Sequence, residues 1–324
     1  MPSLTLVEAT KYSNDVLQTG VIEELVKDDP ILERLKFKSI TGNGLTYNTE
    51  SALSGASFYN VGDEWVESTS VITSKTAFTK ILGGDADVDN FLIATRSGKN
   101  DLMQEQITAK IKAVRRAFND MALYGDVDID TKGFDGLHKL LQSGTLNTVA
   151  VGTSTGTPVT LSLAKAEEAV DLIKNGKPSV CLMTKAERRG INKYLNGVGG
   201  ITKMDIQGAT VQTLFDVPII VSDHLSDDES SDRDYGTNNF GHDYTDGIAL
   251  GNDDNATSIF FLQFEDFAFA GVQSGGGLST QKFDKLETKD ASRVRIRWYP
   301  SVMLQSLISC SKVTGVDPAG TVTA

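Results

Sequence analysis

The chain has 324 residues, of which 40% are hydrophobic and 23% are charged, and its formal net charge at pH 7 is -12. This composition is typical of a folded globular protein of one or two domains, and it argues against wholesale disorder. The acidic balance also argues against a protein that coats DNA, because affinity for duplex DNA comes mainly from Lys and Arg side chains that neutralise phosphates.

The first 35 residues mix polar and apolar side chains and predict an N-terminal arm rather than a separate domain. Residues 14–25 form a candidate helix with an apolar stripe that Gly20 interrupts. The opening segment has neither a basic region nor an apolar core, so it predicts no secretory signal. No window approaches the roughly 18 apolar residues of a membrane span. We therefore expect a protein that is made in the cytoplasm and does not contact membranes.

Residues 45–82 predict a long β-hairpin. A first strand at 45–53 and a return strand at 66–82 flank a middle that contains Gly, Asn and Asp. Along the return strand the side chains alternate between two faces, and both faces are half polar. A two-stranded ribbon with so few large apolar side chains is marginal alone in water, so we expect it to lie on something else, such as a neighbouring subunit.

Residues 101–124 give the strongest helix prediction. Six apolar residues recur there at spacings of three and four, which places them on one face of a helix. They are Met103, Ile107, Ile111, Val114, Phe118 and Met121. Asn100 is a candidate N-cap, and Gly125 occupies the position of a C-terminal capping glycine. At 1.5 Å per residue the helix would be about 36 Å long, enough to form the backbone of a domain.

A second region follows residues 133–141 and a Gly/Thr-rich stretch at 152–158 that has the composition of a linker. Ser162 is a candidate cap for a helix closed by Gly176. A buried strand, a second helix and another strand come next, with the sequences VCLMT, KAERRGINKYL and VPIIVSD. This alternation predicts an α/β domain of about 100 residues, and a polar segment at 226–256 follows it.

From Ser258 onward the sequence is typical of β-structure. Three consecutive glycines at 275–277 predict a turn, after which comes the strand SRVRIRWY. Arg293, Arg295 and Arg297 share one face of this strand because side chains alternate with period 2. Two interpretations stay open. The arginines contact an acidic surface on a neighbour or on the arm, or they form a face that is solvated or paired within the chain.

One serine motif is a candidate for nucleophilic catalysis. Ser154 lies in GTSTG at 152–156, which matches the G-x-S-x-G pattern, and Asp223 and His242 would complete the chain order Ser, Asp, His. A nucleophile elbow requires a strand that runs directly into a helix, whereas Thr157, a proline and further β-like residues follow here. A serine hydrolase is therefore a distant alternative, and we expect no enzyme and no catalytic residue.

Acidic runs are the candidate metal sites. Two of them have the spacing with which an EF-hand begins, namely Asp85, Asp87 and Asp89, and Asp126, Asp128 and Asp130. Neither run has the Gly at position six and the Glu at position twelve that this loop requires, so solvated acidic turns are the preferred interpretation. The acidic segment 227–254 is either a metal loop or an exposed excursion, and the second is the usual case.

Histidines and cysteines give little support to metal chemistry. His138, His224 and His242 are scattered, and no HExxH motif is present. Cys181 and Cys310 are far apart in apolar segments and predict two buried thiols. No glycine-rich phosphate-binding motif is found either. We therefore expect no metal and no cofactor.

The order of the predicted elements resembles the major capsid protein family of tailed bacteriophages, whose Hong Kong 97 type of shell fold is shared with encapsulins. Similar segments cover nearly the whole chain. They are AFNDMALYGD, GFDGLHKLL, KPSVCLMTKAERRGINKYL, TLFDVPIIVSDHL, DGIALGN and SRVRIRWYPSVMLQSLISCSKVTG. Asn252 departs from the Asp that is usual in the family's turn.

The resemblance implies an α+β, Hong Kong 97-like capsid fold with five parts. They are an N-terminal arm and entry to the peripheral domain at 1–44, an extended β-hairpin loop at 45–82, a peripheral domain with spine helix 101–124 at 83–157, an α/β axial domain at 158–260, and a β-rich return to both domains at 261–324. The candidate contacts between subunits are Phe58 and Trp65 on the hairpin and Arg293, Arg295 and Arg297 on the late strand.

The resemblance also implies a structural subunit of a virion, synthesised in the host cytoplasm. The subunit would assemble with itself, as hexamers and pentamers, into an icosahedral shell that encloses double-stranded DNA without sequence-specific binding. A separate scaffolding protein, a portal and a decoration protein are the other implied partners. An encapsulin-like compartment shell is the alternative within the same fold.

Overall fold

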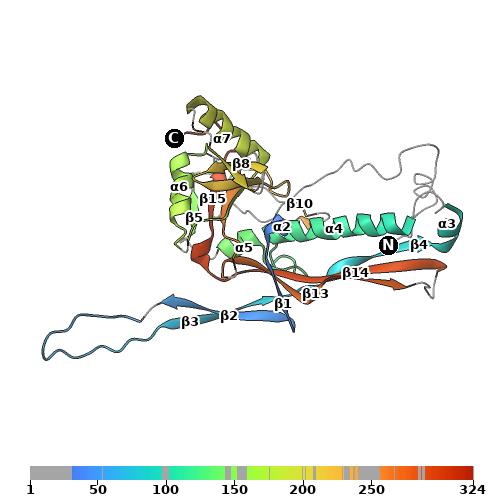
Figure 1. Cartoon of the computed structure of the whole chain (residues 1–324). Coiled ribbons are helices and arrows are strands. Elements are labelled where there is room, and N and C mark those ends of the chain that lie inside the picture. The colour runs from blue at the N-terminus through green and yellow to red at the C-terminus, as the bar shows by residue number, and fades with distance from the viewer. Residues whose placement is uncertain are drawn as a thin grey trace.

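The computed structural model of the chain describes most of its sequence. The described residues are 31–52, 54–96, 102–142, 147–151, 159–174, 176–198, 200, 202–206, 209–227, 229, 234–235, 238–239, 256–265, 267–283, 286 and 289–323. The predicted helix at 14–25, Asn100, Ser154 and His242 lie outside them. The described part consists of a four-stranded sheet, a long helix, a seven-stranded sheet and a protruding ribbon, so it is α+β as predicted (Figure 1).

The protruding ribbon is the predicted hairpin. Its strands are β2 (Gly44–Ala52) and β3 (Val71–Phe78), which pair antiparallel with Gly44 opposite Phe78. The predicted return strand was too long at both ends, since β3 is shorter and Leu82 already begins the next strand. Residues 54–70, which we call the extended tip, form no strand and point away from the rest of the chain (Figure 1).

The four-stranded sheet combines segments from both halves of the chain. In spatial order its strands are β1 (Phe37–Ile40), β13 (Phe269–Phe283), β14 (Ala291–Leu304) and β4 (Leu82–Asp89). β1 runs parallel to β13, and the other neighbours are antiparallel. Short helices α2 (Ile31–Arg34) and α3 (Asn90–Arg96) lie next to β1 and β4 in sequence.

The prediction of a turn at the three glycines is wrong. Gly275, Gly276 and Gly277 lie inside β13, with φ values of +72°, +82° and +102°. The register between β13 and β14 shifts between Ser274 and Ser279, so the glycines form a bulge. Glycine suits this bulge because left-handed backbone costs it no side-chain clash.

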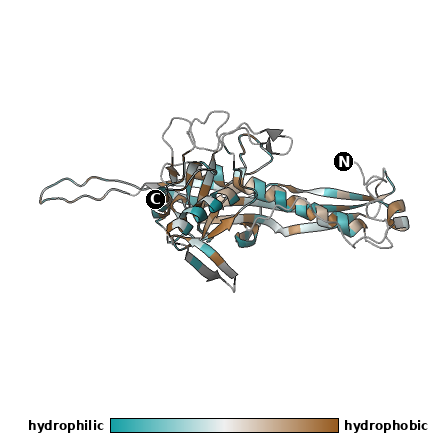
Figure 2. Cartoon of the chain, turned by 90° about the horizontal axis from the view of Figure 1, so that it is seen from above, coloured by the Kyte–Doolittle hydropathy of each residue, from teal (hydrophilic) through white to brown (hydrophobic). Residues whose placement is uncertain are grey.

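The long helix is confirmed as α4 (Leu102–Tyr124), and it packs on β4 and β14. Brown and teal residues alternate along it, as an amphipathic helix requires (Figure 2). Its apolar face contacts the sheet through rings: the Phe118 ring centroid lies 4.6 Å from that of Trp298 and 5.8 Å from that of Phe37. Phe118 is fully buried, so this cluster fixes the helix on the sheet.

Gly125 follows α4 for a different reason from the one predicted. Its φ is not positive, so it is not a left-handed cap. A Cβ at Gly125 would lie 2.2 Å from the carbonyl oxygen of Phe134 and 2.5 Å from that of Met121. The amide of Gly136 in turn donates to the carbonyl of Gly125 at 2.8 Å. Two backbone segments therefore meet at the end of α4, and only glycine leaves room for both.

The seven-stranded sheet includes strands from the last quarter of the chain. In spatial order it consists of β5 (Thr148–Ala150), β15 (Ser311–Val316), β12 (Thr257–Leu262), β6 (Val180–Met183), β9 (Val217–Val221), β8 (Ala209–Leu214) and β7 (Thr202–Ile206). The predicted alternation is confirmed, because β6 and β9 are parallel and a helix follows β6. β10 (Asp234–Tyr235) and β11 (Asn238–Asn239) pair with each other in a separate two-stranded sheet.

Three helices accompany this sheet: α5 (Leu137–Gln142), α6 (Leu163–Asp171) and α7 (Lys185–Val198). Ser162 occupies the N-cap of α6 but makes no side-chain cap hydrogen bond, and Leu172 is the C-cap, so the predicted closure at Gly176 is wrong. A 3-10 turn, Leu307–Ser309, precedes β15.

Two hydrophobic cores lie on the two faces of this sheet. Along β6 and β12, Leu182 and Phe260 point to the core that contains α4, whereas Cys181 and Phe261 point to the core under α6 and α7. Both cysteines are buried and free, and burial raises the pKa of Cys310 to about 11. No helix in the described ranges is long and apolar enough to span a membrane.

Candidate functional site

The extended tip exposes apolar side chains to solvent. Phe58 and Val61 are fully exposed, and Trp65 is 79% exposed. Such side chains are costly in water when they gather on one segment, and monomeric proteins rarely place them so. Phe58 and Trp65 are two of the residues predicted to contact a neighbour, and their exposure leaves them available for it.

The extended tip nevertheless has a defined shape. The rings of Tyr59 and Trp65 stack with centroids 4.5 Å apart and planes inclined by 21°. The amide of Val66 donates to the Tyr59 hydroxyl at 3.1 Å, and the amide of Asn60 donates to the Asp63 carboxylate at 2.6 Å. The tip is thus held in one arrangement by its own contacts, which lowers the entropy that ordering it against a partner would cost.

The root of the ribbon is anchored on the four-stranded sheet. The Tyr47 hydroxyl donates to the carbonyl of Leu304 at 3.0 Å, and burial raises the pKa of Tyr47. Leu45 and Ala77 pack with it against the apolar cluster that contains Met303. Among the described residues, the ribbon therefore packs on the four-stranded sheet at its root, while its far end is exposed to solvent.

Strand β14, which contains Arg293, Arg295 and Arg297, has acidic partners within the chain. Asp87 accepts two hydrogen bonds from Arg293, at 2.6 and 2.7 Å, and Asp85 accepts two from Arg295, at 2.7 and 2.8 Å. These carboxylates lie directly opposite the arginines in the β4–β14 register. Arg297 donates to Gln281 instead.

This pairing has electrostatic consequences. Hydrogen bonds from Arg295 and Arg293 hold the pKa values of Asp85 and Asp87 below their usual range, so both carboxylates stay charged. Of the two open interpretations, pairing within the chain therefore describes Arg293 and Arg295. Contact with a neighbouring subunit stays a prediction for all three arginines.

The prediction of solvated acidic turns is wrong for the first run and for Asp126, but Asp128 of the second run lies in a turn with its side chain 80% exposed. Asp85 and Asp87 lie on β4, and Asp126 is only 2% exposed. The amino group of Lys139 lies 3.1 Å from the Asp126 carboxylate and 2.8 Å from that of Asp128. A lysine thus provides the positive charge between these carboxylates, and no group of three or more candidate metal ligands gathers among the residues described.

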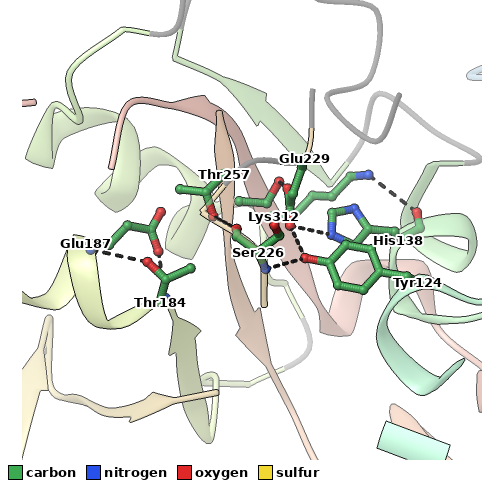
Figure 3. Close-up of polar contacts among 9 residues, drawn as sticks. Tyr124, His138, Thr184, Glu187, Ser226, Glu229, Thr257 and Lys312 are labelled. Carbon is green, nitrogen blue, oxygen red and sulfur yellow. Dashed lines mark hydrogen bonds and ion pairs between the residues drawn. The ribbon is translucent and has the colours of Figure 1, made fainter. Parts of the chain in front are cut away.

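A buried polar cluster surrounds Glu229, at the beginning of the acidic segment 227–254 (Figure 3). Glu229 is completely buried, so the expectation of an exposed excursion is wrong at this residue. Its carboxylate accepts hydrogen bonds from the hydroxyls of Tyr124 at 2.5 Å and Ser258 at 2.6 Å, and it lies 3.2 Å from Nε2 of His138. The cluster joins the end of α4, α5 and β12.

The charge of Glu229 is stabilised within this cluster. Burial alone raises the pKa of Glu229, but the charge of His138 and the hydrogen bonds from His138, Ser258 and Tyr124 outweigh it and hold the pKa below the usual range. The His138 ring also stacks on Tyr124, with centroids 4.8 Å apart. The site is sealed from solvent, so it has a structural role rather than access to a substrate.

A second buried carboxylate, that of Glu187, lies in the first turn of α7. The amide of Thr184 donates to Glu187 at 2.9 Å, and the amide of Glu187 donates to the Thr184 hydroxyl at 3.3 Å, which is a capping box (Figure 3). Burial raises the pKa of Glu187 well above its usual value. The sequence contained this signal, since a threonine stands three residues before a glutamate at a helix start.

Of the three residues of the predicted serine triad, the structure describes only Asp223. Asp223 forms an ion pair with Lys185 at 2.5 Å. His224, the neighbour of Asp223, lies instead 2.5 Å from the carboxylate of Asp120. Ser154 and His242 lie outside the described residues, so the triad stays a sequence prediction.

Comparisons with known proteins identify the fold. The chain is similar to the encapsulin of the holo-SrpI complex from Synechococcus elongatus PCC 7942, with 13% identity, a TM-score of 0.68, and coverage of 100% of this chain and 99% of that one. It is similar to the capsid of a native GTA particle at 10% identity, a TM-score of 0.62, and coverage of 96% and 98%.

The capsid of the cyanophage P-SCSP1u is a third similar structure, at 12% identity, a TM-score of 0.59, and coverage of 93% of this chain and 92% of that one. No protein-family model and no curated protein matches the sequence. The chain therefore has the Hong Kong 97-like fold over its full length, as the sequence resemblance implied.

Proposed function

We propose that the chain is the shell subunit of a phage head, which assembles with copies of itself into a closed icosahedral capsid and performs no catalysis. The observation that carries the proposal is the extended tip. It exposes Phe58, Val61 and Trp65 in a fixed arrangement, on a chain whose fold matches shell subunits from end to end. Burial of these side chains against a neighbour would supply the contacts that the ribbon lacks.

Enclosure of double-stranded DNA follows from the same proposal. A net charge of -12 suits a container, because a shell that bound packaged DNA tightly would hinder its release. Location in the virion, synthesis in the host cytoplasm, and the scaffolding, portal and decoration partners belong to this proposal as well.

A compartment shell is the second candidate. The similarity to an encapsulin covers 100% of this chain at a TM-score of 0.68, so a shell that encloses a protein is compatible with the same subunit. Both candidates require the same self-assembly and differ in what the shell contains. Purified particles separate them, because DNase-resistant DNA favours the phage head and a co-purified protein cargo favours the compartment.

The proposal is tested by assembly of the full chain, followed by light scattering and negative-stain electron microscopy. The double variant Phe58→Ala/Trp65→Ala should keep the thermal stability of the subunit and lose closed shells, because both side chains are exposed in the single chain. Phe91→Ala is the matched control, since this ring is also exposed but lies on α3.

Shells from the double variant in normal yield would contradict the role of the extended tip. A wild-type chain that stays monomeric at every salt concentration, with or without a scaffolding protein, would contradict the shell itself. Hydrolase activity that Ser154→Ala abolishes, with assembly unaffected, would support the serine hydrolase instead.

A further inference from the structure

The solvent face of α7 is strongly basic, although the chain as a whole is acidic. Lys185, Arg188, Arg189 and Lys193 are all exposed. Lys185, Arg189 and Lys193 recur at intervals of four and Arg188 is adjacent to Arg189, so the four share one side of the helix. The only acidic residue of this helix, Glu187, points into the core. Lys185 pairs with Asp223, whereas the other three cations have no ion pair with any residue that the structure describes.

The solvent face of α6 has the opposite charge. Glu167, Glu168 and Asp171 are exposed and share one side of the helix, and Ala166 and Ala169 occupy the buried side. Glu168 pairs with Lys165 of the same helix at 2.6 Å. Within the described ranges, Glu167 and Asp171 form no ion pair.

The two charged faces lie toward different ends of the seven-stranded sheet. α6 packs on β5 and β15 at one end, whereas Asn192 of α7 contacts Gln212 of β8, near the other end. The C-terminal segment lies between the helices, where it meets α6 through the hydrogen bond from Leu163 to Thr323 and meets α7 at Gly190, which Val322 closely approaches. Figure 1 shows this order of α6, C-terminus and α7.

We infer that the basic face of α7 binds the acidic face of α6 on a second copy of the chain, head to tail, so that repeated contacts close a ring of subunits. This inference rests on the proposed shell function and names two surfaces that would meet in it. A contact between two different faces of identical chains is heterologous, and such contacts generate rings when the rotation closes.

A second copy fits these faces better than a nucleic acid does. A polyanion would neutralise α7 but would leave the carboxylates of α6 unpaired, and it would approach a chain with a net charge of -12. A second copy neutralises both faces in one contact. Single exposed ion pairs contribute little, but several of them on facing helices orient the encounter and exclude wrong registers.

Charge reversal of each face tests the inference. Arg189→Glu/Lys193→Glu reverses α7, and Glu167→Lys/Asp171→Lys reverses α6, each at positions four apart. We expect either double variant to raise the concentration required for assembly at least tenfold, measured by light scattering and sedimentation velocity. The quadruple variant, in which both faces are reversed, should assemble like the wild type. Circular dichroism checks that all the subunits fold.

A matched control and a mixing experiment sharpen the test. Lys174→Glu/Lys177→Glu makes the same charge change at exposed positions after α6 and should assemble normally. Equal amounts of the two double variants should associate when mixed, because each reversed face then meets its complement on the other variant. Such mixed rings need an even number of subunits, so five-membered rings should be missing in micrographs.

The outcomes separate this inference from the proposed function. Wild-type shells together with normal assembly of either double variant would overturn the inference alone. Loss of assembly in both double variants without recovery in the quadruple variant or in the mixture would overturn it too, since the charges would then act on different partners. A wild-type chain that never associates would overturn the proposed function and this contact with it.

Discussion

Replacement of Gly136 by alanine tests whether backbone contact at the end of α4 holds the fold together. The new Cβ would lie 2.6 Å from the amide nitrogen of Gly125, 2.6 Å from the carbonyl oxygen of Met121 and 2.9 Å from the carbonyl carbon of Leu123. All three are backbone atoms, so no side chain can rotate to make room. The segment would have to move, and the hydrogen bond from Gly136 to Gly125 would be strained.

The expected loss lies at the upper end of what overpacking costs, about 3 kcal/mol. For a chain of 324 residues it corresponds to a melting temperature lower by about 4 to 5 °C, measured by circular dichroism on unassembled subunits. Gly197→Ala is the control, because it stands in α7 and a Cβ at this position would meet no atom within 4 Å. That variant should gain up to about 1 kcal/mol from helix propensity. Equal melting temperatures for wild type and Gly136→Ala would refute the reasoning.

The two buried carboxylates, Glu229 and Glu187, should make the stability of the subunit depend on pH in opposite ways. Because the pKa of Glu229 is held below its usual value, its charge stabilises the fold above the unfolded-state pKa, and this contribution is lost as the pH falls through the folded-state pKa. The Glu229→Gln variant should therefore have a lower melting temperature at pH 7 and should not show this loss in acid. Glu187 has a raised pKa, so ionisation opposes folding above the usual carboxyl pKa; Glu187→Gln should stabilise the subunit, and more at pH 8 than at pH 5. Asp87→Asn should cost about 1 kcal/mol at low salt and less at 1 M salt in urea unfolding, since its partner Arg293 is partly exposed; a salt-independent loss would point to packing instead.

Single elements with a clear period were predictable from the sequence. α4, α7, β6 and β9 were recognised because helix and strand periodicity is local, and one stretch of chain contains all of the signal. The pairing of strands is not local. β12 and β15 come from the end of the chain and enter the same sheet as β6, which no pattern within either segment indicates.

Strand β14 was predictable in part from the sequence. The shared face of Arg293 and Arg295 was predicted from period 2, but their partners required the register between strands about 200 residues apart. A signal was present, since Asp85 and Asp87 alternate with the same period and the opposite charge. Two alternating runs of opposite charge predict a cross-strand ladder as well as they predict two exposed surfaces, and only the fold decides between them.

Glu229 shows why composition alone misjudged the acidic segment. Nothing in its immediate sequence distinguishes it from the other carboxylates there, because its burial depends on Tyr124, His138 and Ser258 from three separate elements. Removal of one partner would leave a buried charge with fewer hydrogen bonds, so the geometry of all four groups is tightly specified. The junction between α4 and the seven-stranded sheet therefore combines apolar packing with directional hydrogen bonds, which fixes the orientation of the helix on the sheet.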